Sequence, residues 1–432
     1  MQTSFSLAQL ADPDVAEADK ILRACVHCGF CTATCPTYVL LGDERDSPRG
    51  RIYLIKDMLE NERPATGDVV RHIDRCLSCL ACMTTCPSGV HYMHLVDHAR
   101  YHIARTYTRP WLERAIREFL LRVMPYPRRL RVASVMAALG RPFAPLLAAF
   151  GLKPLAAAIR LAPSRAPGPY TETGVHPAQG PRRGRVALMR GCANEALAPS
   201  ITQAAIRLLN RHGVEVVIPP GEGCCGSLAH HMGREAETHA FVTANVDAWT
   251  REIEGEGLDA ILVTLSGCGT TVKDYGFMLR NDAAYADKAA KVSALTRDAT
   301  EYLATLGIRG SGSRNLAVAY HSACSLQHGQ KVTRQPKELL AACGFDVRDV
   351  PEGHLCCGSA GTYNILQPDI AVRLRARKIA NIEKVAPDAI AAANVGCIAQ
   401  LASGTGIPVV HPVELIDWAT GGPVPDGLKG RA

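Results

Sequence analysis

The stretches GEGCCGSLAHHMG (residues 221–233) and GHLCCGSAGT (residues 353–362) each place two cysteines side by side. Neighbouring Cα atoms are about 3.8 Å apart, which is less than the roughly 4.4 Å minimum of ordinary disulfide geometry. A disulfide within either pair is therefore not expected. Two thiolates on one sharp turn can instead face one metal centre, with Gly226 and Gly358 allowing the backbone to curl around it.

The paired cysteines belong to a repeated segment. In each copy one cysteine precedes the pair by 32 positions and another follows it, in SGCGT (266–270) or VGCIA (395–399). Matched spacing of this kind is typical of an internal repeat. An alternative is that these are buried structural thiols, because small buried cysteines are common. The candidate metal sites are Cys192, Cys224, Cys225 and Cys268 in the first copy, and Cys324, Cys356, Cys357 and Cys397 in the second.

Strand-like runs end at the first and last cysteine of each copy. They read RVALMRGC (185–192), AILVTLSGC (260–268), LAVAYHSAC (316–324) and AIAAANVGC (389–397). Helix-like segments separate these runs, and this alternation predicts parallel sheets. Ligands of such sheets collect beyond the carboxyl ends of the strands, so the cysteines of each copy are expected to converge. The remaining cysteine of this half, Cys343, is expected to be a small buried apolar residue.

Two further cysteine runs lie near the N-terminus, CVHCGFCTATCP (25–36) and CLSCLACMTTCP (76–87). Both read C-x2-C-x2-C-x3-C-P, the pattern of two-cluster bacterial ferredoxins, in which the fourth cysteine ligates the other cluster. Zinc is the alternative, and eight thiolates in two copies of this spacing weigh against it. The predicted ligands are Cys25, Cys28, Cys31 and Cys86 for one [4Fe–4S] cluster, and Cys76, Cys79, Cys82 and Cys35 for the other.

Composition limits the class of protein. The chain has 432 residues, 47% of them hydrophobic, and 17 cysteines. The acid-containing N-terminus lacks the basic start and apolar run of a signal peptide, and no apolar run reaches the length of a membrane span. Clustered cysteines in the reducing cytosol serve metals or redox chemistry more often than disulfides. We therefore expect a cytoplasmic protein, either soluble or peripheral at the inner face of the cytoplasmic membrane.

Residues 100–165 are strongly basic. They carry thirteen Lys and Arg against two acids, Glu113 and Glu118, a local excess of +11 in a chain whose net charge is +7. Apolar residues are interleaved at helical spacing, so helices lying against another surface are expected. That surface is an anionic membrane, a partner subunit, or the protein's own domains with a solvated basic face. Residues 162–185 read as a Pro/Gly-rich linker.

The expected fold class is α+β multidomain, with a helical two-[4Fe–4S] ferredoxin-like domain followed by a duplicated α/β domain with parallel sheets. The expected parts are 1–100 (ferredoxin-type domain), 101–180 (basic helical segment and linker), 181–310 (first cysteine-rich domain) and 311–432 (second cysteine-rich domain). A helix is expected from Pro48, with Ser47 as its N-cap. Arg45, Arg49 and Arg51 at its start are interpreted as solvated.

The C-terminal half resembles the cysteine-rich CCG domains of heterodisulfide reductases. The whole arrangement resembles the iron–sulfur subunits of bacterial glycolate oxidases, particularly in ILRACVHCGFCTATCPTYVLLGDERDSPRGRIYLIKDMLE (21–60) and CPSGV (86–90). The subunits of anaerobic glycerol-3-phosphate dehydrogenases form a sister family. Reductase domains end in C-x-x-C, whereas Thr271 and Gln400 stand at the last positions here. Each site thus offers four cysteines, which suffice for zinc or for an iron–sulfur cluster.

The resemblance implies an electron-transfer subunit of a membrane-associated, flavin-dependent 2-hydroxy-acid (glycolate) dehydrogenase. Flavoprotein partners would carry the flavin and the substrate site, so no catalytic residue is expected on this chain, and a quinone or other acceptor would receive the electrons. A nucleic-acid partner is not expected. Three alternatives stay open: the corresponding subunit of a glycerol-3-phosphate or D-lactate dehydrogenase, a thiol–disulfide reductase acting at the CCG sites, and an assembly module whose C-terminal thiols bind zinc.

Overall fold

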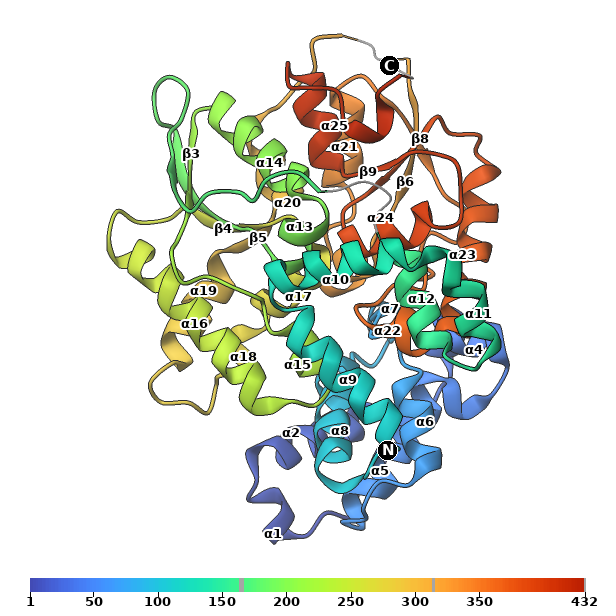
Figure 1. Cartoon of the computed structure of the whole chain (residues 1–432). Helices are drawn as coiled ribbons and strands as arrows, with labels where there is room; N and C mark the ends of the chain where they lie inside the picture. The colour runs from blue at the N-terminus through green and yellow to red at the C-terminus, as the bar shows by residue number, and fades with distance from the viewer. Residues whose placement is uncertain (163–166, 313–314, 431–432) are drawn as a thin grey trace.

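The computed structural model describes residues 1–162, 167–312 and 315–430. A helical N-terminal part lies below two α/β units, which follow one another from green to red in Figure 1. The helices of the N-terminal part are α1 (Leu7–Leu10), α2 (Pro13–Ala24), α3 (Phe30–Thr34), α4 (Pro36–Leu41), η1 (Glu44–Asp46), α5 (Pro48–Glu60), α6 (Gly67–Asp74), α7 (Ala81–Thr85) and α8 (Tyr92–Thr106).

The two N-terminal cysteine runs fold alike. Each is a loop that enters a five-residue helix, α3 or α7, through a residue in the left-handed region, Gly29 (φ 85°) or Leu80 (φ 63°). Each helix ends at the fourth cysteine of its run, Cys35 or Cys86, whose backbone is extended. The chain therefore changes direction at that cysteine. This local geometry separates the fourth sulfur from the three that precede it.

The first α/β unit is built on the sheet β1-β3-β2-β4-β5, in that order. All its pairings are parallel except that of β1 with β3. The strands are β1 (Gly174–His176), β2 (Gly184–Met189), β3 (Val214–Ile218), β4 (Ala260–Val263) and β5 (Thr296–Asp298). The helices are α13 (Cys192–Leu197), α14 (Pro199–Arg211), α15 (Ser227–His231), α16 (Glu235–Glu254), α17 (Ser266–Lys273), α18 (Tyr275–Met278), α19 (Ala286–Leu295), α20 (Ala299–Leu303) and η3 (Ala304–Leu306).

The second unit has the fully parallel sheet β7-β6-β8-β9, which matches β3-β2-β4-β5 of the first in strand order. Its strands are β6 (Ala317–His321), β7 (Asp346–Asp349), β8 (Ala389–Ala392) and β9 (Val409–Val410). The helices are η4 (Ser325–Gly329), α21 (Gln335–Ala342), α22 (Tyr363–Leu366), α23 (Pro368–Glu383), α24 (Val395–Ala402), α25 (Pro412–Ala419) and η5 (Asp426–Leu428). The expectation of parallel sheets is confirmed.

The two α/β units share one hydrophobic core. Strands of both sheets and helices α14, α21 and α25 contribute buried side chains to it, among them Leu188, Val318 and Cys343. Cys343 is fully buried there, which agrees with its interpretation as a packing residue. Because burial of apolar surface is the main stabilising contribution to folding, this core fixes the two units relative to one another.

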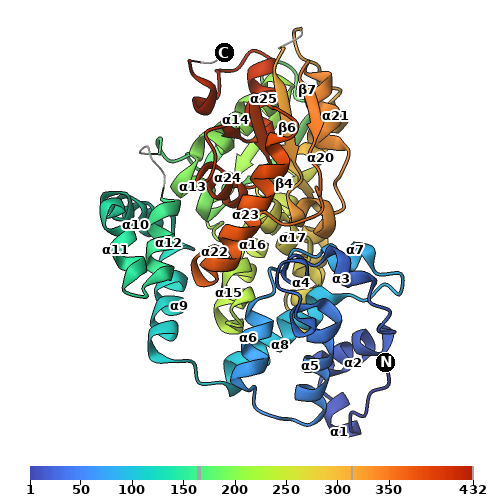
Figure 2. The same cartoon turned by 90° about the vertical axis from the view of Figure 1, so that its right-hand side faces the viewer.

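The basic segment continues from the end of α8 into a group of helices on one side of the molecule (Figure 2). They are α9 (Trp111–Val123), α10 (Pro127–Leu139), α11 (Ala144–Ala149) and α12 (Lys153–Leu161), with η2 (Arg141–Phe143) between α10 and α11. Several of their charges are used within the chain: Arg109 and Arg117 pair with Asp74, and Arg131 lies 3.6 Å from the ring centre of Tyr170. Docking on the protein's own domains therefore accounts for part of the charge.

Among the described residues, no single helix is both long and apolar enough to cross a membrane. One bent pair, Pro127–Leu139 with Arg141–Ala149 at 60°, meets the criteria of length and composition when taken together. The predicted linker, 162–185, falls partly outside the described residues. Its described part contains strand β1, which pairs antiparallel with β3 and adds an edge to the first sheet. The interpretation of that stretch as linker alone was wrong.

The prediction of a solvated Arg51 was also wrong. Arg45 is exposed and Arg49 half-buried, but Arg51 is only 1% exposed. Its guanidinium donates to the carbonyl of His72 at 2.7 Å and to Asp46 Oδ1 at 3.4 Å. Asp46 is itself fully buried and also bonds His72 Nδ1 and Arg75. Sequence reasoning overlooked that Asp46, the acid beside Ser47, would be buried together with Arg51 and pair with it.

We expect Asp46→Ala to destabilise the N-terminal part by about 3–5 kcal/mol, because the buried Arg51 loses its carboxylate partner. Asp57→Ala is the matched control: Asp57 pairs with exposed Arg63, and removing such a pair costs at most about 1 kcal/mol. Hydrogen–deuterium exchange of the full chain, followed in α5 and α6, measures the difference. Equal protection in the two variants would contradict the assigned role of Asp46.

Candidate metal centres

Four predicted ligands of the first ferredoxin-type site lie around one small cavity. It is lined by these four, Cys25, Cys28, Cys31 and Cys86, and also by Cys82, whereas Cys35 is not among its lining residues. Cys86 thus lies beside the cysteines of the first run, although it follows Cys35, the last cysteine of that run, by 51 positions. Burial raises the pKa of the Cys31 thiol to about 11. A metal is the partner that keeps such a sulfur as a thiolate at neutral pH.

The second ferredoxin-type set is more deeply buried. Cys35, Cys76, Cys79 and Cys82 are each at most 9% exposed. Burial raises the pKa of the Cys79 and Cys82 thiols, and both also feel the charge of Cys35. Cys35 Sγ lies 3.2 Å from Thr37 Oγ1 and 3.9 Å from a guanidinium nitrogen of Arg51. The charge of Cys35 thus acts on two cysteines of the second run, and it also acts on Cys31 of its own run.

At the first CCG site the four cysteine sulfurs form a chain of neighbours, in the order Cys192, Cys224, Cys225, Cys268. The Sγ atoms of Cys192 and Cys224 are 3.7 Å apart. Hydrogen bonds from its neighbours lower the pKa of Cys224, whereas the bond to Cys224 and burial raise that of Cys192. The turn is held from outside, because Asn245 donates to the carbonyl of Cys224 at 2.9 Å.

The second CCG site repeats this chain as Cys324, Cys356, Cys357, Cys397, again with 3.7 Å between the first two sulfurs. Gly358 follows the pair with φ 89°, and a Cβ there would lie 2.6 Å from the carbonyl oxygen of Ala371. Only glycine fits this turn. Sulfurs around a tetrahedral zinc, at about 2.3 Å from the metal, are about 3.8 Å apart. The 3.7 Å between the first two sulfurs of each CCG site fits a thiophilic metal centre.

Two functional candidates at the second site were not predicted. His321, the last residue of β6, lies with Cys357 and Cys397 in a group whose ligand atoms are all within 4.8 Å of one another. Lys378 of α23 is 2% exposed, and its Nζ donates to the carbonyl of Glu352 at 2.8 Å. Burial lowers the pKa of Lys378, while nearby Cys357 and Cys356 act in the opposite direction. A strand-end histidine and a helical lysine carry no sequence signal of their own.

The second ferredoxin-type set and the second CCG site are neighbours. Cys79 and Leu77 pack in one buried cluster with Cys356 and Tyr363, and Cys324 lies against it. The contact is fixed by hydrogen bonds between the domains, from Tyr363 Oη to the carbonyl of Arg75 at 3.0 Å and between Thr84 Oγ1 and His328 Nδ1 at 2.8 Å. Cys25 and Cys28 are not part of this contact. The second ferredoxin-type set therefore lies next to a CCG site, whereas Cys25 and Cys28 of the first set do not contact that site.

Both CCG sites open on one large cavity of about 1080 Å³. Cys192, Cys268, Cys324 and Cys397 line it, together with Cys76 of the ferredoxin-type part. The basic segment lines the cavity mainly with apolar side chains, although Arg117, Arg128 and Arg129 also line it. The apolar ones are Leu120 and Val123 of α9, Met124 just after it, Leu130, Ala133 and Met136 of α10, and Leu155 and Ile159 of α12. The basic segment thus covers the CCG cysteines with a mainly apolar inner surface.

Two known protein families match this chain. The family described as "4Fe-4S dicluster domain" matches residues 21–90, and the family described as "Cysteine-rich domain" matches residues 186–273 and 318–402. A crystal structure of a hypothetical protein from Helicobacter pylori has a TM-score of 0.55 at 11% identity, over 95% of this chain and 73% of that one, which shows a shared fold. Together these domains define an iron–sulfur, oxidoreductase-type electron-transfer protein.

Individual relatives show to which family of iron–sulfur proteins the chain belongs. The chain is 42% identical to the "Glycolate oxidase iron-sulfur subunit" of Escherichia coli (strain K12), over 97% of this chain and 99% of that protein. It is 30% identical to the "Probable glycolate oxidase iron-sulfur subunit" of Bacillus subtilis (strain 168), over 93% and 94%. A "Lactate utilization protein A" of Bacillus licheniformis is 27% identical over 54% of this chain and 99% of that protein. The chain belongs to the family of glycolate oxidase iron–sulfur subunits.

Proposed function

We propose that this chain is the electron-transfer subunit of a membrane-associated, flavin-dependent glycolate dehydrogenase, and that it passes electrons from flavoprotein partners to a quinone-type acceptor. When bound, the [4Fe–4S] clusters supply one-electron redox chemistry. Their proposed ligands are the crossed cysteine sets, Cys25, Cys28, Cys31 and Cys86 for one cluster and Cys76, Cys79, Cys82 and Cys35 for the other. The CCG cysteines are the proposed ligands of two further metal centres.

The observation that carries the proposal is the arrangement of the cysteine sets in space, in which one set lies next to another. The second ferredoxin-type set packs against the second CCG site through Cys79 and Cys356, and both CCG sites border the large apolar cavity. Burial of these cysteines keeps water from the metal ligands, and buried arginines such as Arg51 place positive charge beside them. Burial, charge and hydrogen bonds to sulfur are the means by which a protein sets cluster potentials.

The cavity has the features that a quinone acceptor needs. Its wall of α9, α10 and α12 side chains is mainly apolar, with Arg117, Arg128 and Arg129 as its charged members, and a mainly apolar wall suits a lipophilic molecule. Reduction of a quinone to a quinol takes two electrons and two protons, and His230 and His231 line the same cavity beside Asp97, at 3.3 Å and 3.0 Å. Burial alone would lower the pKa of His230, but the Asp97 carboxylate raises it overall. His230 can therefore hold a proton next to the site.

Membrane association is proposed through the end of α10, η2 and α11 up to Phe150, which follows it. Leu139, Phe143, Leu146 and Phe150 are each at least 55% exposed, and the surrounding segment is basic. Exposed apolar side chains flanked by arginines are typical of helices that lie in the interface of an anionic bilayer. Helix α10 also lines the cavity, so a lipid-borne acceptor would have a short path to it.

Serine in place of Leu139, Phe143, Leu146 and Phe150 should weaken binding to anionic phospholipid vesicles at least about tenfold, because a buried apolar side chain contributes about 1.5–3 kcal/mol. Co-sedimentation of the full chain measures the binding. Serine at Val175 and Val372, which are exposed on other elements, is the matched control and should leave binding unchanged. Equal vesicle binding by all variants would exclude this surface as the membrane contact.

Co-purification tests the proposal as a whole. A tagged chain, isolated anaerobically from its own organism, should bring flavin-containing subunits with it, and the mixture should reduce a quinone analogue when glycolate is added. Reduction driven by glycerol 3-phosphate or D-lactate, and not by glycolate, would show that the complex oxidises that substrate and would contradict the proposed glycolate dehydrogenase. If the chain is recovered alone and reduces disulfides with electrons from an artificial donor, it is a thiol–disulfide reductase and the proposed electron-transfer role is wrong.

A further inference from the structure

The two CCG sites differ at one position of the repeat. His321 lies three residues before Cys324, and Met189 lies three residues before Cys192. Both are the last residues of corresponding strands, β6 and β2, and both are buried. Met189 packs in the apolar core of the first unit. The second site therefore has an imidazole where the first has a thioether.

His321 has no partner of the usual kind. It is 2% exposed, and within the described residues neither ring nitrogen has a hydrogen-bond partner. A buried polar group without a partner destabilises the fold. The buried His411, by contrast, uses both ring nitrogens, with the carbonyl of Thr264 at 2.9 Å and the amide of Val413 at 3.1 Å. A purely structural histidine would be satisfied in that way.

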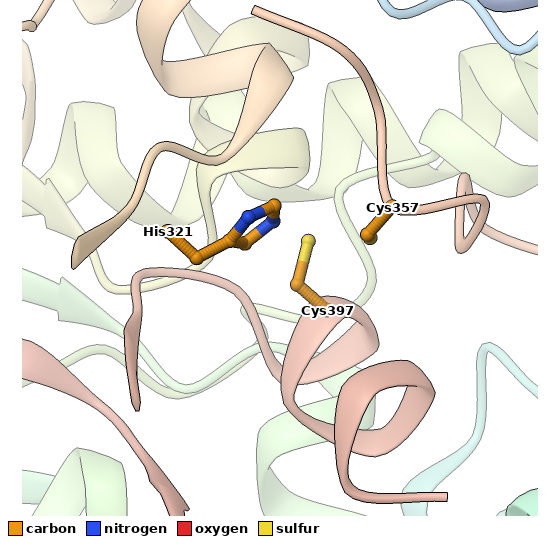
Figure 3. A group of neighbouring side chains, drawn as sticks. All are labelled: His321, Cys357 and Cys397. Carbon is orange, nitrogen blue, oxygen red and sulfur yellow. The ribbon is translucent and has the colours of Figure 1, made fainter. Parts of the chain in front are cut away.

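The ring of His321 faces the cysteines instead. In Figure 3 the sulfur of Cys397 lies between the imidazole of His321 and Cys357. The ligand atoms of these three residues are all within 4.8 Å of one another. The three come from three separate elements: the end of strand β6, the turn after β7 and the first turn of α24. Such convergence at the carboxyl end of a parallel sheet is where a ligand is expected.

We propose that His321 is a metal ligand of the second CCG site, which then binds its metal through thiolates and one imidazole nitrogen, whereas the first site uses thiolates alone. The bound species is a thiophilic transition-metal centre, either zinc or iron in a sulfide cluster, because both accept this mixed donor set. Binding to the metal would give a partner to one ring nitrogen of His321 that otherwise has none among the described residues. The proposal rests on a metal at this site and is independent of which substrate the partner subunits oxidise.

The test uses the full chain, purified anaerobically, with its histidines labelled with ¹⁵N. If iron fills the site, pulsed EPR of the reduced protein should show a histidine nitrogen coupled to the metal, since the ferredoxin-type sets contain only sulfur ligands. If zinc fills it, X-ray absorption should show a nitrogen scatterer at about 2.0–2.1 Å. Absence of nitrogen from the spectra of every metal bound by the wild-type chain would overturn the proposal.

Variants separate a ligand from a structural side chain. His321→Met, which copies the first site, should abolish the nitrogen signal and lower the affinity for the metal at least about tenfold. His321→Cys should restore the metal content while replacing nitrogen by sulfur in the spectra. Met189→Leu is the matched control and should change neither. An unaltered nitrogen signal in His321→Met or His321→Cys would show that another residue supplies it, and His321 would not be a ligand.

Discussion

Cys86→Ser should remove about half of the iron and acid-labile sulfide of the ferredoxin-type part, although Cys86 belongs to the second cysteine run. The reason is that Cys86 lines the cavity formed by Cys25, Cys28 and Cys31, so its loss deprives the first cluster of its fourth thiolate. Iron and sulfide analysis and low-temperature EPR of the anaerobically purified variant measure the loss. The cluster that remains should be the one built on Cys76, Cys79 and Cys82.

Cys343→Ala is the control for this experiment. Cys343 is fully buried and lies in the core shared by the two α/β units, away from the proposed ligands. Its replacement should lower stability slightly and leave the iron content unchanged. Two intact, unaltered [4Fe–4S] signals in Cys86→Ser would sink the crossed assignment, and a loss of the cluster on Cys76, Cys79 and Cys82 would mean that each run ligates its own cluster.

The double variant Cys356→Ser, Cys357→Ser should abolish quinone reduction by the assembled complex and leave both ferredoxin-type clusters intact. These two residues are central in the sulfur chain of the second CCG site, and Cys356 also packs beside Cys79. Iron content, cluster EPR and steady-state quinone reduction are the measurements. The matched variant at the first site, Cys224→Ser with Cys225→Ser, shows whether that site is needed as well.

An active, fully assembled complex with unchanged metal content would defeat the assignment of the second CCG site. Loss of the ferredoxin-type signals together with activity would show only that the contact around Cys79 had collapsed. Tyr363→Phe provides a check on that contact, because it removes the hydrogen bond to the carbonyl of Arg75 and leaves every cysteine in place. It should keep both the clusters and most of the activity.

The sequence was most informative where the chemistry is local. Ligand spacing such as C-x2-C-x2-C is set by a few residues, so both cysteine runs could be recognised without any structure. The strand runs that end at Cys192 and Cys324 predicted parallel sheets, because alternation of strand and helix along the chain leaves few other arrangements. The repeat placed the paired cysteines in corresponding positions of the two units.

The features that sequence reasoning missed depend on packing between distant segments. Arg51 is drawn into the interior by Asp46, an acid five residues away whose burial cannot be read from its neighbours. His321 looks like an ordinary strand residue until β6, α24 and the turn after β7 are brought together. The contact between Cys79 and Cys356 joins residues of two domains and has no local signal at all. The apolar cavity likewise exists only because α9, α10 and α12 fold back over the cysteines.

Reoxidation of the clusters in the assembled complex tests the central claim most directly. The complex is reduced with glycolate, mixed rapidly with a quinone analogue, frozen at intervals and examined by EPR. In wild type both ferredoxin-type signals should appear with glycolate and disappear with the quinone. In Cys356→Ser, Cys357→Ser they should appear at the wild-type rate and persist after the quinone is added. Equally fast disappearance in the variant would contradict an electron path through the second CCG site.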